Sequence, residues 1–253
     1  MSGLAVSKYQ GTGNDFVMLL DMEDRTPLTA PLAAALCDRR FGVGADGVIR
    51  VTRDADGADA FMDHRNADGS LAEMCGNGIR CLAAFLVDRG LGGERLAVGT
   101  RAGRKTIESE IVDGRVVSVT VGMGAPVLDA ARVPMTGGTG TFLRQPFAVG
   151  DRTFTASAVS MGNPHLVLHL DAPADDALVT DIGPRIERDA RFPEGVNVEF
   201  VVASGDSLDV RVWERGVGET KGCGTGACAS LVAANEAGLV GRSATVRFPG
   251  GDL

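Results

Sequence analysis

The sequence lacks the features of several common classes of protein. It has no apolar run that approaches the ~18 residues of a membrane span, and Met1–Gln10 has no basic segment followed by an apolar block. Lys and Arg number 25 against 33 Asp and Glu, which gives a net charge of −8 with no basic run. These absences argue against nucleic acid or an anionic membrane as a partner and predict a cytoplasmic protein.

Histidine and cysteine are also scarce. There are three histidines, and the five cysteines do not have zinc-binding spacings, so we expect no metal site. An odd number of cysteines without a secretion signal predicts reduced thiols rather than a disulfide framework. Cys37, Cys81 and Cys228 fall within predicted helices, where a small buried apolar role is expected.

The remaining composition is that of an ordinary globular protein. The chain is 44% hydrophobic and 23% charged, and 253 residues fit one large or two medium domains with a buried core. The pattern predicts helices over Pro31–Arg39, Ile79–Arg89, Ile182–Glu187 and Ala227–Leu239. It predicts strands over Leu4–Tyr9, Phe16–Asp21, Gly47–Thr52, Ala60–His64, Leu96–Thr100, Lys105–Ile111, Val116–Val121, Phe147–Val149, Thr153–Met161, Leu166–His169, Val198–Val202, Asp209–Trp213 and Thr245–Phe248. Many strands around few helices predict an α+β fold.

One cysteine stands between glycines where a loop turns into an apolar helix. In Asn66–Cys81 (NADGSLAEMCGNGIRC), Cys75 precedes an apolar helical run that begins at Ile79 and closes at Gly90. The sulfur is then beside unpaired backbone N–H groups, which favour a thiolate and lower the thiol pKa from about 8.5 toward neutrality. The same N–H groups can bind a carboxylate or phosphate. The simpler interpretation is a small residue that fills a turn.

The motif occurs twice. Lys221–Asn235 (KGCGTGACASLVAAN) places Cys223 before a second apolar helical run. Upstream, GNDFVMLL resembles GNPHLVLHL, and FGVGADGVIRV resembles FPEGVNVEFVV. Asn66 and Glu214 each stand nine residues before their cysteine. A series of matches in one order predicts two similar halves, and the Gly- and Pro-containing segment near 122–126 predicts domains of residues 1–122 and 123–253.

Two similar halves with one such cysteine each suit the inversion of a carbon stereocentre. That reaction requires a base on one face of the carbon and an acid on the other. With no lysine motif for pyridoxal phosphate, the carbanion must be stabilised through its carboxylate, and helix N-termini could do so like an oxyanion hole. Gly76, Asn77, Gly224 and Thr225 would provide the backbone donors.

Six segments in this order resemble diaminopimelate epimerase: GTGNDFV, FGVGADG, NADGSLAEMCGNGIRC, SMGNPH, GVNVEF and WERGVGETKGCGTGACAS. The likeness spans nearly the whole chain. It implies two homologous domains related by pseudo-twofold symmetry, each a strand-rich, barrel-like sheet around a central helix. It also implies a homodimer that converts LL- to meso-2,6-diaminopimelate without a cofactor, for lysine and peptidoglycan precursors, with the two cysteines on opposite faces of the substrate.

The resemblance extends to individual polar residues. The side-chain amides that match substrate-holding positions are Asn14, Asn66, Asn163 and Asn197. Arg215 resembles the partner of the distal carboxylate, within a Glu-Arg pair. His165 and Glu214 resemble residues that tune a cysteine pair needing one thiolate and one thiol. Without the resemblance, each Asn could be a turn former and His165 a satisfied surface residue.

Other functions remain open from the residues. A proline or hydroxyproline racemase would share the architecture and the paired cysteines, but it typically has His where Asn77 stands. A thiol redox protein would use Cys75 and Cys223 as a disulfide switch, and a binding module would only hold an amino acid. Some members of the resembled family have Gln at the position of Gly47, so that substrate contact is absent here or filled otherwise.

Overall fold

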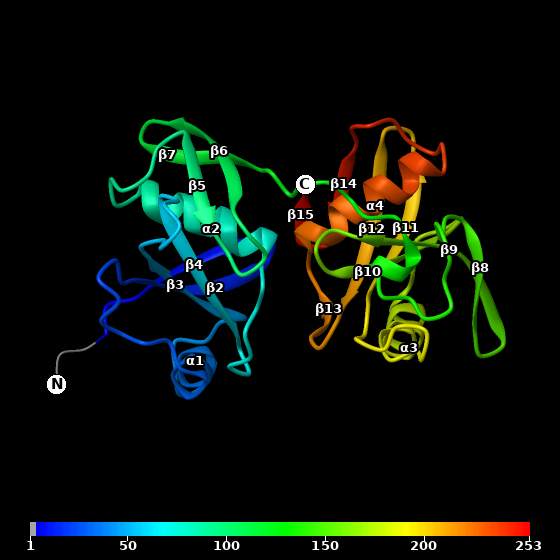
Figure 1. Cartoon of the computed structure of the whole chain (residues 1–253), viewed down its shortest axis with the longest axis horizontal. Coiled ribbons are helices and arrows are strands. Elements are labelled where there is room, and N and C mark those ends of the chain that lie inside the picture. The colour runs from blue at the N-terminus through cyan, green and yellow to red at the C-terminus, as the bar shows by residue number, and fades with distance from the viewer. Residues whose placement is uncertain (1–3) are drawn as a thin grey trace. The chain divides into compact units, whose positions relative to one another are not determined.

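The computed structural model describes residues 4–253, which divide into two compact units, one ending at Gly122 and the other spanning Met123–Leu253 (Figure 1). Each unit is a mixed sheet with two long helices, as expected for an α+β fold. Within the described residues, no helix is long and apolar enough to cross a membrane.

Unit 1 forms a seven-stranded sheet whose strands follow chain order. Its strands are β1 (Ser7–Gly11), β2 (Asn14–Leu20), β3 (Gly47–Thr52), β4 (Ala60–Asn66), β5 (Arg95–Gly99), β6 (Lys105–Val112) and β7 (Arg115–Val121), and its helices are α1 (Ala30–Cys37) and α2 (Gly76–Val87). Helices α1 and α2 make the crossovers of the two parallel pairs, β2 with β3 and β4 with β5. The other neighbours pair antiparallel.

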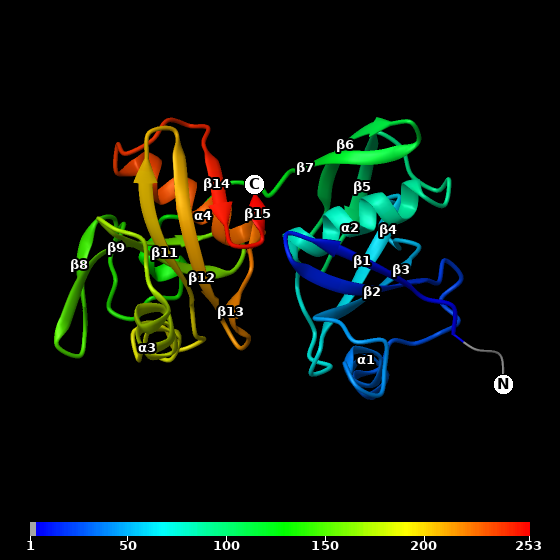
Figure 2. The same cartoon turned by 180° about the vertical axis from the view of Figure 1, so that it is seen from behind.

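The sheet of unit 1 curls around helix α2, which contacts the edge strands β1 and β7 as well as β2 and β3 (Figure 2). Alternate residues of each strand point to α2 and form the main core with Ile79, Leu82, Phe85 and Leu86. The opposite residues, such as Val17 and Val48, pack with α1 in a smaller core. Side chains on the α2 face of the strands therefore approach the start of this helix.

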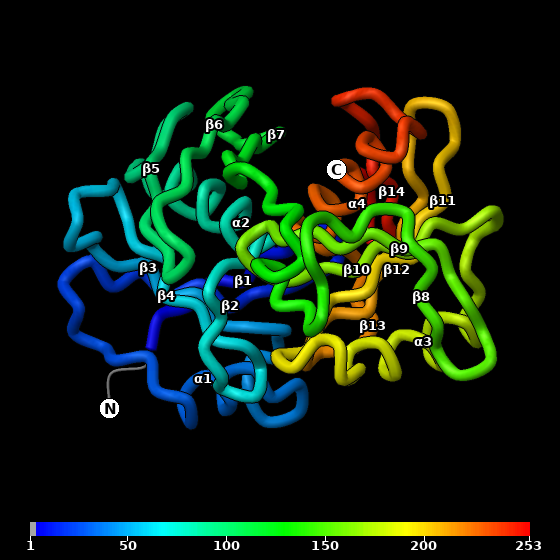
Figure 3. Tube along the Cα trace, turned by 45° about the vertical axis from the view of Figure 1, so that its right-hand side comes forward, coloured from blue at the N-terminus to red at the C-terminus, as the bar shows by residue number. Residues whose placement is uncertain are grey.

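Unit 2 has the same pairing sequence with one more strand. Its strands are β8 (Gln145–Val149), β9 (Arg152–Ser160), β10 (Pro164–His169), β11 (Asn197–Ser204), β12 (Ser207–Glu214), β13 (Gly218–Thr220), β14 (Thr245–Phe248) and β15 (Gly251–Asp252), with helices α3 (Asp176–Glu187) and α4 (Gly224–Glu236) and a 3-10 turn at Ala130–Arg132. The strand order of the sheet is β15-β14-β12-β11-β10-β9-β8, and β13 pairs with β12. Figure 3 follows the chain as a Cα trace, from blue at the N-terminus to red at the C-terminus.

The two units repeat one topology. In both, an antiparallel pair is followed by a parallel pair across a helix, an antiparallel pair, a parallel pair across the cysteine-bearing helix, and an antiparallel pair. Strands β1 to β6 thus correspond to β9, β10, β11, β12, β14 and β15. Helix α4 packs on β9 to β12, and α3 covers the other face of that sheet. The predicted similarity of the halves is confirmed at the level of topology.

Most predicted elements are present, with shifted ends. Strand β1 ends at Gly11, later than predicted, because a tight turn at Thr12 and Gly13, both at positive φ, carries it into β2. Helix α3 begins six residues earlier than predicted, since Asp175 caps it by accepting a hydrogen bond from Leu178 N at 2.7 Å. The short strands β13 and β15 were not predicted.

Candidate active site

Both candidate cysteines occupy the N-cap position of a helix. Cys75 has φ −138° and ψ 117°, and Cys223 has φ −130° and ψ 119°. The thiol Sγ of Cys75 accepts from Gly78 N at 3.4 Å, and that of Cys223 accepts from Gly226 N at 3.3 Å. Because the sulfur caps the helix, α2 and α4 each begin three residues before the predicted apolar runs. The expected position of the sulfur beside helix-start N–H groups is confirmed.

Around Cys75 a chain of side chains fixes the orientation of two asparagine amides. Arg80, which can only donate, gives a hydrogen bond to Asn77 Oδ1 at 2.8 Å. Asn77 Nδ2 donates to Asn14 Oδ1 at 2.6 Å, and Asn14 Nδ2 donates to Asp46 Oδ2 at 3.1 Å, where the carboxylate can only accept. The charged ends therefore determine which way both amides point.

Asn66 ends strand β4 on the face of the sheet toward α2. It pairs with Gly47 in register, and its Nδ2 donates to Ser70 Oγ at 3.0 Å. A Cβ on Gly47 would lie 2.7 Å from His64 Nε2, so no side chain fits at residue 47 in this structure. The ring of His64 fills that place instead.

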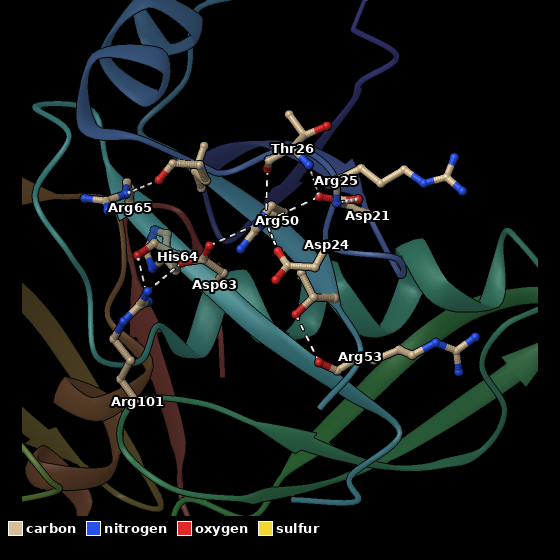
Figure 4. Close-up of polar contacts among 12 residues, drawn as sticks. Asp21, Asp24, Arg25, Thr26, Arg50, Arg53, Asp63, His64, Arg65 and Arg101 are labelled. Carbon is tan, nitrogen blue, oxygen red and sulfur yellow. Dashed lines mark hydrogen bonds and ion pairs between the residues drawn. The ribbon is translucent and has the colours of Figure 1, made fainter. Parts of the chain in front are cut away.

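His64 was not predicted as a functional residue. Its side chain is 4% exposed, and neither ring nitrogen has a hydrogen-bond partner within the described chain. Burial, with a smaller contribution from the positive charge of Arg101, lowers the pKa of His64 to about 4. Arg101 approaches the backbone carbonyl of His64 at 3.4 Å and the carboxylate of Asp63 at 2.6 Å (Figure 4).

A closed chain of side chains surrounds Cys223. His165 Nδ1 lies 2.6 Å from Glu199 Oε1, and its Nε2 lies 3.0 Å from Asn163 Oδ1, so Nε2 carries a hydrogen. Asn163 Nδ2 donates to Thr225 Oγ1 at 3.3 Å, and Thr225 Oγ1 lies 3.3 Å from Cys223 Sγ. His165 is fully buried, so the alternative of a surface histidine is wrong.

The expectation of a lowered thiol pKa is wrong for Cys223. Burial raises its pKa well above the usual value, and the negative charges of Glu214 and Glu199 raise it further. The hydrogen bonds from Thr225 and Gly226 N act in the opposite direction but are the weaker influence. A helix N-terminus therefore does not outweigh desolvation at this position.

The surroundings of Glu214 raise the pKa of its carboxyl. Burial raises the pKa of its carboxyl, whereas a hydrogen bond from Thr220 Oγ1 and contact with the Cys223 thiol lower it. The carboxyl belongs to a residue that is only partly buried overall, but it lies against the thiol and Glu199. Burial thus raises the pKa of both Glu214 and Cys223.

Asn197 and Arg215 complete the second set of candidate residues. The Asn197 amide donates through Nδ2 to Pro164 O at 2.9 Å and accepts from Arg215 N at 2.9 Å. The Cγ and Cδ methylenes of Arg215 lie beside Gly195, and its guanidinium donates from Nη1 to Glu194 O at 3.2 Å. Its other donors make no side-chain hydrogen bond within residues 4–253, and a guanidinium suits a carboxylate ligand.

Comparisons with known proteins agree with this geometry. The family model of diaminopimelate epimerase matches residues 6–128 and 157–253. The chain belongs to the diaminopimelate epimerase family. A diaminopimelate epimerase of Synechococcus sp. (strain JA-3-3Ab) is 47% identical, covering 100% of this chain and 90% of the relative. A diaminopimelate epimerase of Moorella thermoacetica is 45% identical, covering 97% of this chain and 88% of the relative.

Solved structures show that the fold is shared more widely than the family. A hydroxyproline epimerase from Agrobacterium vitis has a TM-score of 0.67 at 17% identity, covering 97% of this chain and 80% of its own. A probable proline racemase from Agrobacterium radiobacter K84 has a TM-score of 0.72 at 16% identity, covering 98% and 82%. Membership of the diaminopimelate epimerase family makes the chain an enzyme. It favours epimerisation of diaminopimelate over the racemase, redox and binding-module alternatives.

Side-chain contacts link Asn14 to Asn77 in the first turn of α2, and they link His165 and Asn163 through Thr225 to Cys223 at the start of α4. Asn66, Asn197 and Arg215 make their hydrogen bonds to other segments. Sequence reasoning missed three residues of these networks, which are Asp46, Arg80 and Glu199. Arg80 lies one helical turn after Gly76, and Glu199 lies two residues after Asn197 on the same face of β11, so helix and strand periodicity could have identified both.

The rest of the described chain offers no rival centre of the same kind. Cys37 and Cys81 are buried, which raises their pKa values to about 11 and about 12, and Cys228 is partly buried against the unit 2 core. Residues 4–253 contain no group of three or more His, Cys, Asp or Glu placed to hold a metal ion. The surface grooves beside Pro173 in unit 2 are lined by none of the candidate residues.

Proposed function

We propose that the chain converts LL-2,6-diaminopimelate to meso-diaminopimelate by proton transfer between Cys75, Cys223 and the α-carbon, with no cofactor. The observation that carries the proposal is the repeated cap: two cysteines, one per unit, accept a backbone hydrogen bond at the start of a helix with the same geometry. Relatives named diaminopimelate epimerase cover the whole chain and support the substrate.

In the proposed reaction one cysteine thiolate removes the α-proton from one face of the substrate. The electron pair of the broken C–H bond stays on the α-carbon and spreads into the carboxylate. The other cysteine, as a thiol, gives its proton to the opposite face, which forms the inverted C–H bond. The former thiolate is now a thiol and the former thiol a thiolate, so proton exchange with solvent restores the starting state.

We assign the role of initial acid to Cys223. Its buried surroundings and the nearby carboxyls of Glu214 and Glu199 disfavour a thiolate, so it enters the cycle protonated. Cys75, which is partly exposed, is then the initial base. This assignment holds for the isomer whose α-proton faces Cys75, and the roles exchange for the other isomer.

The remaining candidate residues bind the substrate. Backbone N–H groups of Gly76, Asn77, Gly224 and Thr225 at the helix starts stabilise the α-carboxylate as charge develops on it. The amides of Asn14, Asn66, Asn163 and Asn197 hold the amino and carboxylate groups, and Arg215 with Glu214 holds the distal end. We also propose a cytoplasmic homodimer, which light scattering during gel filtration would test.

Incubation of LL-diaminopimelate in deuterated water with Cys75→Ala and Cys223→Ala tests the two-base assignment. Each variant should lose roughly 1,000-fold or more in kcat, because general acid–base groups commonly contribute 10²–10⁴-fold. Cys228→Ala, which changes a cysteine of α4 away from its cap, is the matched control and should retain activity. Wild-type turnover in either Cys75→Ala or Cys223→Ala would contradict the proposed two-base mechanism.

The alternative substrates and cofactor chemistry are tested in the same assay. L-proline and trans-4-hydroxy-L-proline should not be racemised, since Asn77 stands where the racemases typically have His. Aminooxyacetate, which captures pyridoxal phosphate, should leave the rate unchanged. Turnover of proline at a rate comparable with diaminopimelate would favour the racemase alternative.

A further inference from the structure

Glu199 lies on strand β11 in a position where a carboxyl group weakens the fold. Its side chain has no exposed surface, and Oε1 lies 2.6 Å from His165 Nδ1. The other oxygen, Oε2, is buried and has no hydrogen-bond partner within residues 4–253. A buried carboxyl with one unsatisfied oxygen is destabilising, so packing does not explain its presence.

The duplicated half shows that the topology does not require a carboxyl at this position. Gly47 pairs with Phe16 in β2, and Asn197 pairs with His165 in β10, which makes Gly47 and Asn197 equivalent. Two residues further along the strand, Ile49 is equivalent to Glu199. The first unit fills the place with a buried apolar side chain.

The carboxyl of Glu199 lies against the first turn of helix α4. A Cβ on Gly226 would lie 2.8 Å from Glu199 Oε1 and 3.4 Å from Cys223 Sγ. The glycine thus lets the carboxyl and the thiol approach the helix start from neighbouring positions. From Glu199 the contacts run through His165, Asn163 and Thr225 to the thiol, so this carboxyl is the far end of the chain of side chains that reaches Cys223.

The charges around the thiol give Glu199 a second influence. The titratable groups that face Cys223 are Glu214 on β12, Glu199 on β11 and, through Glu199, His165 on β10. Burial raises the pKa of the Glu199 carboxyl itself, whereas the charge and hydrogen bond of His165 lower it. When ionised, this carboxyl disfavours a thiolate at Cys223 across buried space, where screening is weak. In unit 1, Ile49 at the equivalent position exerts no such effect on Cys75.

We propose that Glu199 is a positioning residue of the second half-site, by which we mean the residues of unit 2 around Cys223; the first half-site is the corresponding set around Cys75. Glu199 orients Asn163 through His165 and keeps Cys223 protonated until substrate is bound. The assignment rests on the proposed function for its catalytic meaning. Its effect on the thiol is independent of any substrate. It makes the two cysteines chemically unequal although their caps are alike.

Thiol alkylation measures this effect directly. Wild type, Glu199→Gln and Glu199→Ile are treated with iodoacetamide from pH 6 to 11, and the modified Cys223 and Cys75 peptides are quantified by mass spectrometry. In Glu199→Gln the pH of half-maximal alkylation of Cys223 should fall by about one unit, a roughly tenfold change in thiolate population, while that of Cys75 stays unchanged. Asp209→Asn removes one charge from the same sheet on an exposed pair with Arg247 and should move neither cysteine.

Steady-state kinetics separate orientation from charge. Glu199→Gln can still accept a hydrogen bond from His165, so KM should change little. Because the charge is lost, kcat should fall about tenfold and its pH profile should shift. Glu199→Ile copies the residue of unit 1 but cannot hold His165, so it should raise KM as well. Both variants should be at least as stable as wild type in thermal unfolding.

Several outcomes would overturn the assignment. An unshifted Cys223 titration in Glu199→Gln, or equal shifts at both cysteines, would show that Glu199 does not act on Cys223. A large loss of thermal stability in both variants would give the residue a structural role instead. A shift of Cys223 alone in a protein without epimerase activity would leave the assignment standing and remove the proposed function.

Discussion

The two half-sites share a backbone and differ in what surrounds it. The caps at Cys75 (φ −138°, ψ 117°) and Cys223 (φ −130°, ψ 119°) have nearly the same backbone conformation. Around Cys75 the amides of Asn77 and Asn14 are fixed by Arg80 and the exposed Asp46. Around Cys223 the corresponding network closes through buried Glu199 and His165. The duplicated element thus preserves position, while its neighbours determine protonation.

The two units also differ at the equivalent positions Ile49 and Glu199, whose side chains lie against the first turns of α2 and α4. In unit 1, apolar Ile49 pairs with His64, whereas in unit 2 Glu199 pairs with apolar Val212. Each of these residue pairs therefore contains one buried titratable side chain with an unsatisfied atom, which is His64 on β4 in unit 1 and Glu199 on β11 in unit 2. A reaction that needs one thiol and one thiolate gains from such inequality, because identical surroundings would favour the same charge on both sulfurs.

Alanine substitution of the equivalent glycines Gly78 and Gly226 should have the largest effect and should affect the two units unequally. A Cβ at Gly78 would meet the side-chain ends of Ile49 and Met62 at 2.7 and 3.0 Å, which can move. A Cβ at Gly226 would meet the carboxyl of Glu199 at 2.8 Å and displace it from the helix start. We expect Gly226→Ala to lower kcat/KM by roughly 100-fold and Gly78→Ala by less than about tenfold, because only the first moves a charged group of the network.

Steady-state assays with circular dichroism of both alanine variants check this expectation. Alanine has the higher helix propensity, by about 1 kcal/mol, so both variants should remain folded. Equal losses of activity in the two variants would show that the first helical turns tolerate no side chain in either unit, whatever lies beneath them. The inequality of the half-sites would then not originate at Glu199.

Acid should destabilise the protein through its buried histidines. Burial lowers the pKa of His64 to about 4 from 6.5, and burial with Arg144 lowers that of His169 to about 4. Because these folded-state values lie below that of the unfolded chain, the unfolded state binds protons first as the pH falls. Stability should be constant above pH 6.5 and decrease by ~3 kcal/mol for His64 between pH 6.5 and 4.

Urea denaturation at several pH values measures this decrease. The His64→Phe variant should lose the corresponding part of the slope, and His169→Phe a smaller part, because His169 is less buried and hydrogen-bonds Ser157. Arg101 and Asp63 face the backbone side of His64 and have opposite effects on its pKa. An unchanged slope in His64→Phe would mean that the imidazole is not neutral in the folded protein.

Much of the fold and of the half-sites could be predicted from the sequence. The helix-start cysteines follow from glycine placement before apolar runs, and the repeat follows from ordered matches. The raised pKa of Cys223 could not be predicted, since it depends first on burial of the thiol and then on Glu214 and Glu199, which strand pairing brings near it. The role of Gly47 was equally hidden, because the ring that replaces its side chain comes from the neighbouring strand.

Loosening the first half-site should have a moderate effect. Arg80→Met keeps the length of the side chain but removes the donor that fixes Asn77 Oδ1, so Asn77 and Asn14 can rotate. A hydrogen bond to a charged group contributes ~1.5–3 kcal/mol, so we expect KM for diaminopimelate to rise about 10- to 100-fold with a smaller effect on kcat. Arg89→Met, in the turn after the end of α2, is the control for a lost arginine. An unchanged KM in Arg80→Met would show that the amides need no such restraint.

The smallest expected effect is a gain in stability. His64→Phe replaces a buried ring that has two unsatisfied nitrogens with one that has none, and it retains the edge contact with Phe16, whose ring centroid lies 5.7 Å away. Removing an unsatisfied buried polar group should raise the free energy of unfolding by about 1–2 kcal/mol at pH 7. The wider Phe ring must still fit beside Gly47, so His64→Leu is measured in parallel. If both variants are less stable than wild type, the imidazole of His64 makes a contact that stabilises the fold. The buried polar groups of His64 and Glu199 would then be present for different reasons.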